Sequence, residues 1–158
     1  MKPKVLLLCT TLMLVAGRSF CQSAAVINTH FDAMVKHDVK AIASGYADTA
    51  KVFSPNWEGA KIGPAGLTET YSRYFASTPD LAYKITHIIT AGNEVIVQFT
   101  QSGTLSNPEG GTPDYMKGKK YTLDCCAVFS VKENKIVGET DYFDQVAFLR
   151  QVGFFDQH

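Results

Sequence analysis

The sequence lacks an excess of charge of either sign, because fifteen Lys and Arg residues balance fifteen Asp and Glu residues. It also lacks long runs of like charge, low-complexity tracts and internal repeats. A neutral chain of this kind has no field that favours nucleic acid or an anionic membrane. We therefore expect a small molecule or a protein as partner, and no nucleic acid. A length of 158 residues allows one domain with a sizeable core.

Motifs for metal binding, phosphate binding and nucleophilic catalysis are also lacking. The four histidines show no H-x-x-x-H or similar spacing, so we expect no metal site. Gly110 and Gly111 precede no predicted helix, and the sequence contains no G-x-S-x-G motif. The sequence therefore predicts no cofactor.

The N-terminal segment has the layout of a secretory signal peptide. Two early lysines precede a mostly apolar stretch over residues 5–16, which is too short for an ordinary transmembrane helix. Small residues then stand at suitable positions before Gln22. We expect residues 1–21 to be a signal peptide and residues 22–158 to form the exported domain, periplasmic or secreted. A lipid anchor at Cys21 is disfavoured, since the residues before it do not fit a lipoprotein signal.

Cysteine is scarce, and its placement does not indicate a disulfide framework. Cys125 and Cys126 are adjacent in a predicted strand, so their side chains point to opposite faces. A disulfide between them would be strained. Two buried, reduced thiols are the better interpretation.

The hydrophobic pattern changes from helical to alternating at Pro79. Helices are predicted over residues 23–36 and 39–45, from Gly63 to Pro79, and over residues 145–152; residues 47–57 are irregular or strand-like. Strands are predicted over residues 82–90, 94–104, 119–132 and 136–143. Helices followed by a run of antiparallel strands indicate an α+β domain with its helices on one face of the sheet.

Several segments together resemble the SnoaL-like polyketide cyclases of the nuclear-transport-factor-2-like superfamily. The segments are His37–Asp48, Phe53-Ser54-Pro55, Gly63 with the helix after it, Thr78-Pro79-Asp80-Leu81, Gly103-Thr104 and Lys135–Phe155. The resemblance implies a cone-shaped, curved antiparallel sheet wrapped over N-terminal helices and enclosing a pocket. It also implies a small hydrophobic molecule as ligand, and a homodimer.

Asp141 is the candidate catalytic residue. The resemblance implies that it acts as general acid and base in an aldol closure, while the family's assisting His corresponds to Ala127 and its Asn to Ser54. Strand alternation places Asp141 on one face with Val137, Glu139 and Phe143. An apolar pocket would raise its pKa toward neutrality. Alternatively, Asp141 caps the final helix, although Asp144 is the better cap candidate.

The candidate ligand-binding residues are Tyr46, Ser54, Trp57, Phe75, His87, Cys125, Ala127 and Phe143. An enolate formed in the pocket would need a hydrogen-bond donor, for which Tyr46, Ser54, Trp57 and Tyr83 are candidates. His30 is expected to be a partly buried, hydrogen-bonded histidine. Two functions stay open. One is an enzyme acting on a small hydrophobic carbonyl compound through Asp141, and the other is a non-catalytic ligand-binding or dimerisation module.

Overall fold

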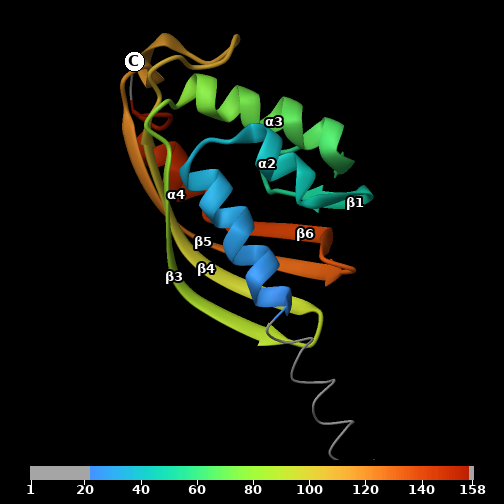
Figure 1. Ribbon diagram of the computed structural model, residues 1–158. Coiled ribbons are helices and arrows are strands. Elements are labelled where there is room, and N and C mark those ends of the chain that lie inside the picture. The colour runs from blue at the N-terminus through green and yellow to red at the C-terminus, as the bar shows by residue number, and fades with distance from the viewer. Residues whose placement is uncertain (1–21, 157–158) are drawn as a thin grey trace, which may run out of the picture.

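The computed structural model describes residues 22–156, and the predicted signal peptide lies outside them. A first helix over residues 22–35 is followed by α2 (Val39–Ser44), β1 (Tyr46–Phe53), β2 (Lys61–Ile62), α3 (Gly63–Ser77), β3 (Ala82–Ala91), β4 (Glu94–Thr104), the 3₁₀ helix η1 (Asp114–Met116), β5 (Lys120–Lys132), β6 (Lys135–Phe143) and α4 (Gln145–Gln151). The first helix, α2 and α3 lie against one face of a curled sheet (Figure 1). The predicted α+β class and the helix-covered curved sheet are confirmed.

The sheet has six strands in the order β2-β1-β6-β5-β4-β3. Strands β3 to β6 form the predicted antiparallel meander. The whole sheet is mixed, however, because β1 pairs in parallel with β6. These two strands are separated by most of the chain, so no hairpin dictates their relative direction.

Two irregularities change which side chains face the helices. In β3 the register shifts between Ile85 and His87, and in the β5–β6 pair it shifts near Val137. Each shift adds one residue to one strand, as in a β-bulge, which reverses the inward and outward alternation beyond it. Ile136 is therefore fully buried, whereas Val137 is only half-buried.

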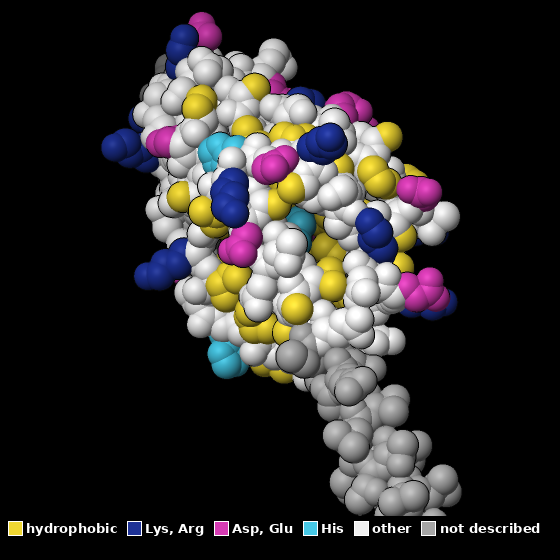
Figure 2. All heavy atoms as spheres, in the orientation of Figure 1, with side chains coloured by type: hydrophobic (Ala, Val, Ile, Leu, Met, Phe, Trp, Pro, Cys, Tyr) yellow, Lys and Arg dark blue, Asp and Glu magenta, His cyan; other side chains and the backbone are white. Residues whose placement is uncertain are grey.

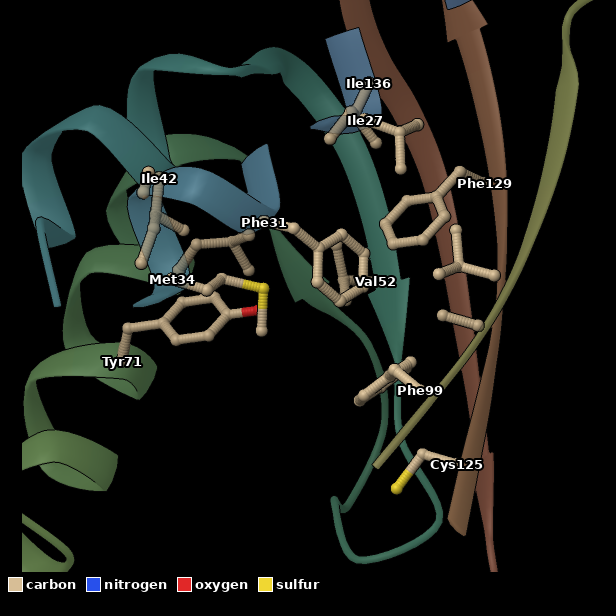
Figure 3. Close-up of a cluster of buried hydrophobic side chains, with 14 of the residues drawn as sticks. Ile27, Phe31, Met34, Ile42, Val52, Tyr71, Phe99, Cys125, Phe129 and Ile136 are labelled. Atoms are coloured by element: carbon tan, nitrogen blue, oxygen red, sulfur yellow. The ribbon is translucent and has the colours of Figure 1, made fainter. Parts of the chain in front are cut away.

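The core lies between the concave face of the sheet and the helices (Figure 3). Its labelled members are Ile27, Phe31, Met34, Ile42, Val52, Tyr71, Phe99, Cys125, Phe129 and Ile136. Phe31, on the first helix, packs edge-to-face against Phe99 and Phe129 at centroid distances of 5.2 and 6.2 Å. Such contacts tie the first helix to the middle of the sheet.

Side-chain caps set the start of two short helices. Asp38 accepts a hydrogen bond from the Ala41 amide at 2.9 Å and begins α2. Asp144 accepts one from the Ala147 amide at 3.0 Å and begins α4, as the sequence predicted. Cys125 and Cys126 form no disulfide with each other; Cys125 is buried, as predicted, whereas Cys126 is only half-buried, contrary to the prediction.

The surface carries charges of both signs. Basic and acidic side chains are interspersed over the face shown in Figure 2, with no patch of a single sign. This distribution agrees with the balanced composition of the chain. In the part of the chain described by the structure, no helix is long and apolar enough to cross a membrane.

The first residue of α3, Gly63, lies close to the backbone of β1, and a substitution there tests this close approach. Gly63 has a φ of 57°, and a Cβ there would lie 2.3 Å from the Asp48 carbonyl oxygen. We expect Gly63→Ala to lower the free energy of unfolding by about 2–3 kcal/mol, because strain and a backbone clash add. Gly92→Ala is the matched control, since Gly92 has a φ of 64° with open space around it. Denaturant melts giving equal losses for the two variants would contradict the clash.

Candidate active site

A cavity of about 360 Å³ lies between the helices and the concave face of the sheet. Aromatic side chains contribute much of its wall: Phe31, Trp57, Tyr71, Tyr74, Tyr83, Phe99, Tyr121, Phe129, Phe143 and Phe148. Aliphatic residues and a few polar groups complete the lining. The volume and the apolar wall are typical of a site for a small organic molecule.

Asp141 and Glu139 project into this cavity from the same face of β6. On β5, Ala127 is opposite Asp141 and Phe129 is opposite Glu139. Glu139 and Ser54 both lie close enough to the Asp141 carboxyl to influence its pKa. Capping of α4 is performed by Asp144. Asp141 is thus available to a molecule in the cavity.

Glu139 lines the cavity but was not among the site residues predicted from the sequence. Its side chain is only 5% exposed, and its Oε2 accepts a hydrogen bond from the Tyr46 hydroxyl. The sequence placed Glu139 two residues from Asp141 on the same face, and that spacing was the available signal. This spacing alone did not single out Glu139, because its hydrogen bond with Tyr46, which is 93 residues away, could not be predicted from the sequence.

His30 contacts the same Tyr46 hydroxyl that donates to Glu139. Its Nε2 is 3.4 Å from the Tyr46 hydroxyl oxygen, and its ring makes edge contacts with Phe31, Tyr46, Tyr71 and Phe129. Its Nδ1 has no hydrogen-bond partner among the described residues. Burial lowers the pKa of His30 to about 3. His30 is therefore a neutral member of the core and supplies no positive charge to the carboxyl pair.

Burial determines the protonation of the two carboxyls. It raises the pKa of Asp141 to about 6, against the hydrogen bonds from Glu139 and Ser54, which lower it. Burial, followed by the neighbouring Asp141 charge, raises the pKa of Glu139 well above its ordinary value. The pair accordingly holds a shared proton near neutral pH. A carboxyl with a pKa close to the working pH can both accept and donate a proton.

Tyrosine hydroxyls are the candidate donors to a ligand oxygen. Tyr71 and Tyr83 line the cavity, and in the described part of the chain neither hydroxyl has a hydrogen-bond partner. The electrostatic influence of both carboxyls reaches Tyr71, and burial raises its pKa well above the ordinary value. It therefore stays protonated and able to donate. Of the donors predicted from the sequence, Tyr46 is already engaged with Glu139.

The other predicted site residues divide into two groups. Ser54, Trp57, Cys125, Ala127 and Phe143 line the cavity. Tyr46 lies behind Glu139 and does not line it, and Phe75 instead stacks on His37 at a centroid distance of 4.0 Å. His87 is exposed, because the register shift after Ile85 turns it to the outer face of the sheet.

The polar groups at the cavity entrance bond mostly to one another. The Trp57 Nε1–H donates to the Tyr74 hydroxyl oxygen. The Ser54 hydroxyl lies 3.0 Å from Asn56 Oδ1 and also within reach of Asp141, so its single proton can serve one acceptor at a time. Burial raises the pKa of the Cys125 thiol to about 12, which keeps it protonated and poorly nucleophilic.

The long loop between β4 and β5 forms part of the cavity wall. Its members Leu105, Pro108, Glu109, Thr112 and Met116 line the cavity. Glu109 pairs with Arg73 of α3 at 2.6 Å, which ties the loop to the helix at an exposed position. The structure thus packs this loop against the site. Within residues 22–156, no cluster of three His, Cys, Asp or Glu side chains could hold a metal ion.

Comparison with known proteins identifies the fold. A family model described as a SnoaL-like domain matches residues 27–139. No curated protein matches the chain. A protein from Jannaschia sp. CCS1, described as a SnoaL-like polyketide cyclase, is 14% identical with a TM-score of 0.75, over 85% of this chain and 93% of that one.

Two further solved structures contain small molecules. TerC, co-crystallised with polyporic acid, is 21% identical with a TM-score of 0.69, over 83% of this chain and 98% of that one. A protein with a ketosteroid isomerase-like fold from Catenulispora acidiphila, in complex with trimethylamine, is 16% identical with a TM-score of 0.68. It is matched over 81% of this chain and 92% of its own. At these identities the similarity establishes the fold.

The pKa of Asp141 predicts a pH-dependent stability difference. Because its folded-state pKa of about 6 exceeds the ordinary Asp value of 3.8, the unfolded chain releases this proton first as the pH rises. The contribution of Asp141 to stability therefore falls between about pH 4 and pH 6 and stays low above that. We expect Asp141→Asn to be more stable than the wild type by about 2 kcal/mol at pH 7, with little difference at pH 4. Urea melts across this range giving a constant difference would contradict the raised pKa.

Proposed function

Because the chain belongs to the SnoaL-like domain family, we propose that it binds a small hydrophobic carbonyl compound and uses Asp141 as general base and acid. The observation that carries this proposal is a carboxyl of raised pKa facing an aromatic cavity, with unpartnered tyrosine hydroxyls in the same wall. A base, a donor and a dry cavity are what proton abstraction next to a carbonyl requires.

The lining favours an uncharged ligand. Arg73 is the one cationic lining residue among those described, and it lies at an exposed position paired with Glu109. An anionic ligand would meet the Asp141 charge in the interior with no counter-ion, which is unfavourable in an apolar site. Small molecules crystallised with two proteins of this fold support the use of the cavity for binding.

The proposed chemistry needs no further group. The Asp141 carboxylate accepts a proton from the carbon next to the carbonyl, the electron pair of the broken C–H bond forms a carbon–carbon double bond, and the π pair of the carbonyl moves to its oxygen. The resulting enolate oxygen accepts a hydrogen bond from Tyr71 or Tyr83. Asp141 then returns the proton to a carbon or oxygen of the same molecule. Return to a different carbon gives isomerisation, and attack of the enolate on a second carbonyl gives an aldol closure.

A non-catalytic binding module is the second candidate. Ala127 is directly opposite Asp141 on β5 and contributes no second group for proton transfer. The same aromatic cavity would bind an apolar molecule without reaction. The two functions therefore differ in whether a bound ketone exchanges its acidic hydrogens.

Hydrogen exchange of model ketones tests the catalytic function. The protein is incubated in D₂O with neutral aryl ketones, and loss of the α-hydrogen signals is followed by NMR. We expect Asp141→Asn to reduce the catalysed exchange by about 10²-fold or more, because the base is removed. Asp144→Asn is the matched control, since Asn also caps a helix well and residue 144 is outside the cavity lining.

The outcomes separate the candidates. Exchange that needs Asp141 but tolerates Asp144→Asn supports the enzyme. Quenching of Trp57 fluorescence by ketones, without exchange of any of them, would favour the binding module.

We also propose that the protein is exported and dimeric. The support for export is the segment over residues 1–21, and dimerisation rests on the family resemblance. After expression with the full N-terminal segment, we expect the exported fraction to contain a chain that begins at Gln22, measured by intact mass. Size-exclusion chromatography with light scattering is expected to give twice the chain mass. Retention of residues 1–21 would contradict export, and a monomer would contradict dimerisation.

A further inference from the structure

We propose that Glu139 is a positioning residue whose buried carboxyl keeps its proton and donates it as a hydrogen bond to Asp141. The pair then carries one negative charge, which resides on Asp141. This inference rests on the proposed role of Asp141 as the base and adds the group that holds that base ready.

The geometry of β6 places the two carboxyls together. Residues 139 and 141 are two apart on one strand, so both side chains leave the same face. Glu139 lies at the buried end of the pair, where its carboxyl accepts from Tyr46 and contacts Asp141. Two carboxylates in hydrogen-bond contact must share a proton unless a cation lies beside them.

Among the described residues, no group packed around the pair supplies such a cation. The titratable groups facing it are His30 from the first helix, Tyr46 from β1, Tyr71 and Tyr74 from α3, Tyr83 from β3 and Cys125 from β5. The tyrosines and the thiol are neutral at ordinary pH. His30 has an orphaned Nδ1 in an apolar cluster, which is a poor site for a charged imidazole.

Burial decides which carboxyl keeps the proton. Glu139 is 5% exposed, whereas Asp141 is partly open to the cavity. Glu139 accepts from the Tyr46 hydroxyl through Oε2, which leaves its other oxygen to carry a proton toward Asp141. The ionised form of a carboxyl is favoured where it is better solvated. The charge therefore belongs on Asp141 and the proton on Glu139.

A protonated Glu139 serves the proposed reaction in two ways. Its O–H bond to Asp141 keeps the base ionised inside an apolar cavity, where burial alone would protonate it. It also fixes the orientation of the Asp141 carboxylate, because Tyr46 holds Glu139 from behind. An ionised Glu139 would do the opposite, since a second negative charge would repel the first and raise the pKa of Asp141 further.

Carboxyl ¹³C NMR tests this assignment directly on the ligand-free full-domain protein, residues 22–158. We expect the Glu139 carboxyl signal to stay at the protonated position from pH 4 to pH 8, while the Asp141 signal titrates. Asp141→Asn and Glu139→Gln assign the two signals. A Glu139 signal that moves to the ionised position below pH 7 would overturn the proposal.

Two substitutions test the hydrogen bond itself. In Glu139→Gln an amide N–H replaces the carboxyl O–H, so the pKa of Asp141 should stay within about half a pH unit of the wild type. In Glu139→Leu the donor is lost, and the pKa of Asp141 should rise by about one or more. Equal shifts in the two variants, or a large fall in Glu139→Gln, would show that Glu139 is not a neutral donor. Glu139→Leu leaves the Tyr46 hydroxyl without its acceptor, so circular dichroism is used to check that this variant is folded. If it is unfolded, the titrations of the wild type and of Glu139→Gln decide the question.

The readouts keep this inference separate from the proposed function. If Glu139 proves to be neutral but no ketone exchanges its hydrogens, Glu139 is still a donor to Asp141, and the catalytic role of Asp141 is refuted. If exchange is found, the acidic limb of the pH–rate profile should keep its wild-type position in Glu139→Gln and should move to higher pH in Glu139→Leu. A loss of activity in both variants with an unchanged profile would indicate a merely structural Glu139.

Discussion

Two carboxyl groups that touch inside an apolar cavity cannot both be ionised when no cation lies beside them, and much of this site follows from that constraint. Glu139 and Asp141 leave the same face of β6, and the donors around them are neutral hydroxyls. A buried neutral acid therefore stands next to a partly exposed carboxylate. The arrangement avoids a large desolvation penalty because just one charge is kept, and Glu139 and Ser54 beside this charge favour it.

The same residues that build the core also hold the site. Phe31 of the first helix packs on Phe99 and Phe129, and His30, its neighbour, packs on Tyr46. Tyr46 in turn donates to Glu139. Fold and site are thus joined by a short series of contacts from helix to strand. Displacing the first helix would expose the carboxyl pair to water, which would bring the pKa of Asp141 back toward its ordinary value.

Local patterns predicted most of the fold. The alternation after Pro79 gave the four antiparallel strands to within one residue at each end, and the Asp144 cap was identified correctly. The parallel pairing of β1 with β6 was missed, because pairing between distant segments leaves no local mark. The exposed position of His87 was missed for a related reason, since a single extra residue in β3 reverses the alternation on which the prediction depended. In the site, Asp141 was predicted from its position in the family resemblance. The positions of Glu139 and Tyr71 in the site could not be predicted in this way, because they depend on contacts with residues far away in sequence.

The replacement at Ala127 and the burial of Glu139 are two parts of one arrangement. Across the β5–β6 pair, the residue opposite Asp141 is an alanine, so the neighbouring strand offers the carboxylate no hydrogen bond from a side chain. A carboxylate in an apolar wall with a single hydroxyl donor, from Ser54, would be poorly stabilised. The second donor comes from the same strand, two residues earlier, and its side chain must offer both a donor for Asp141 and an acceptor for Tyr46. A glutamate is long enough to do both. In this chain, then, the ionisation of Asp141, the proposed base, depends on its own strand and on a tyrosine behind it, and it does not require a basic residue.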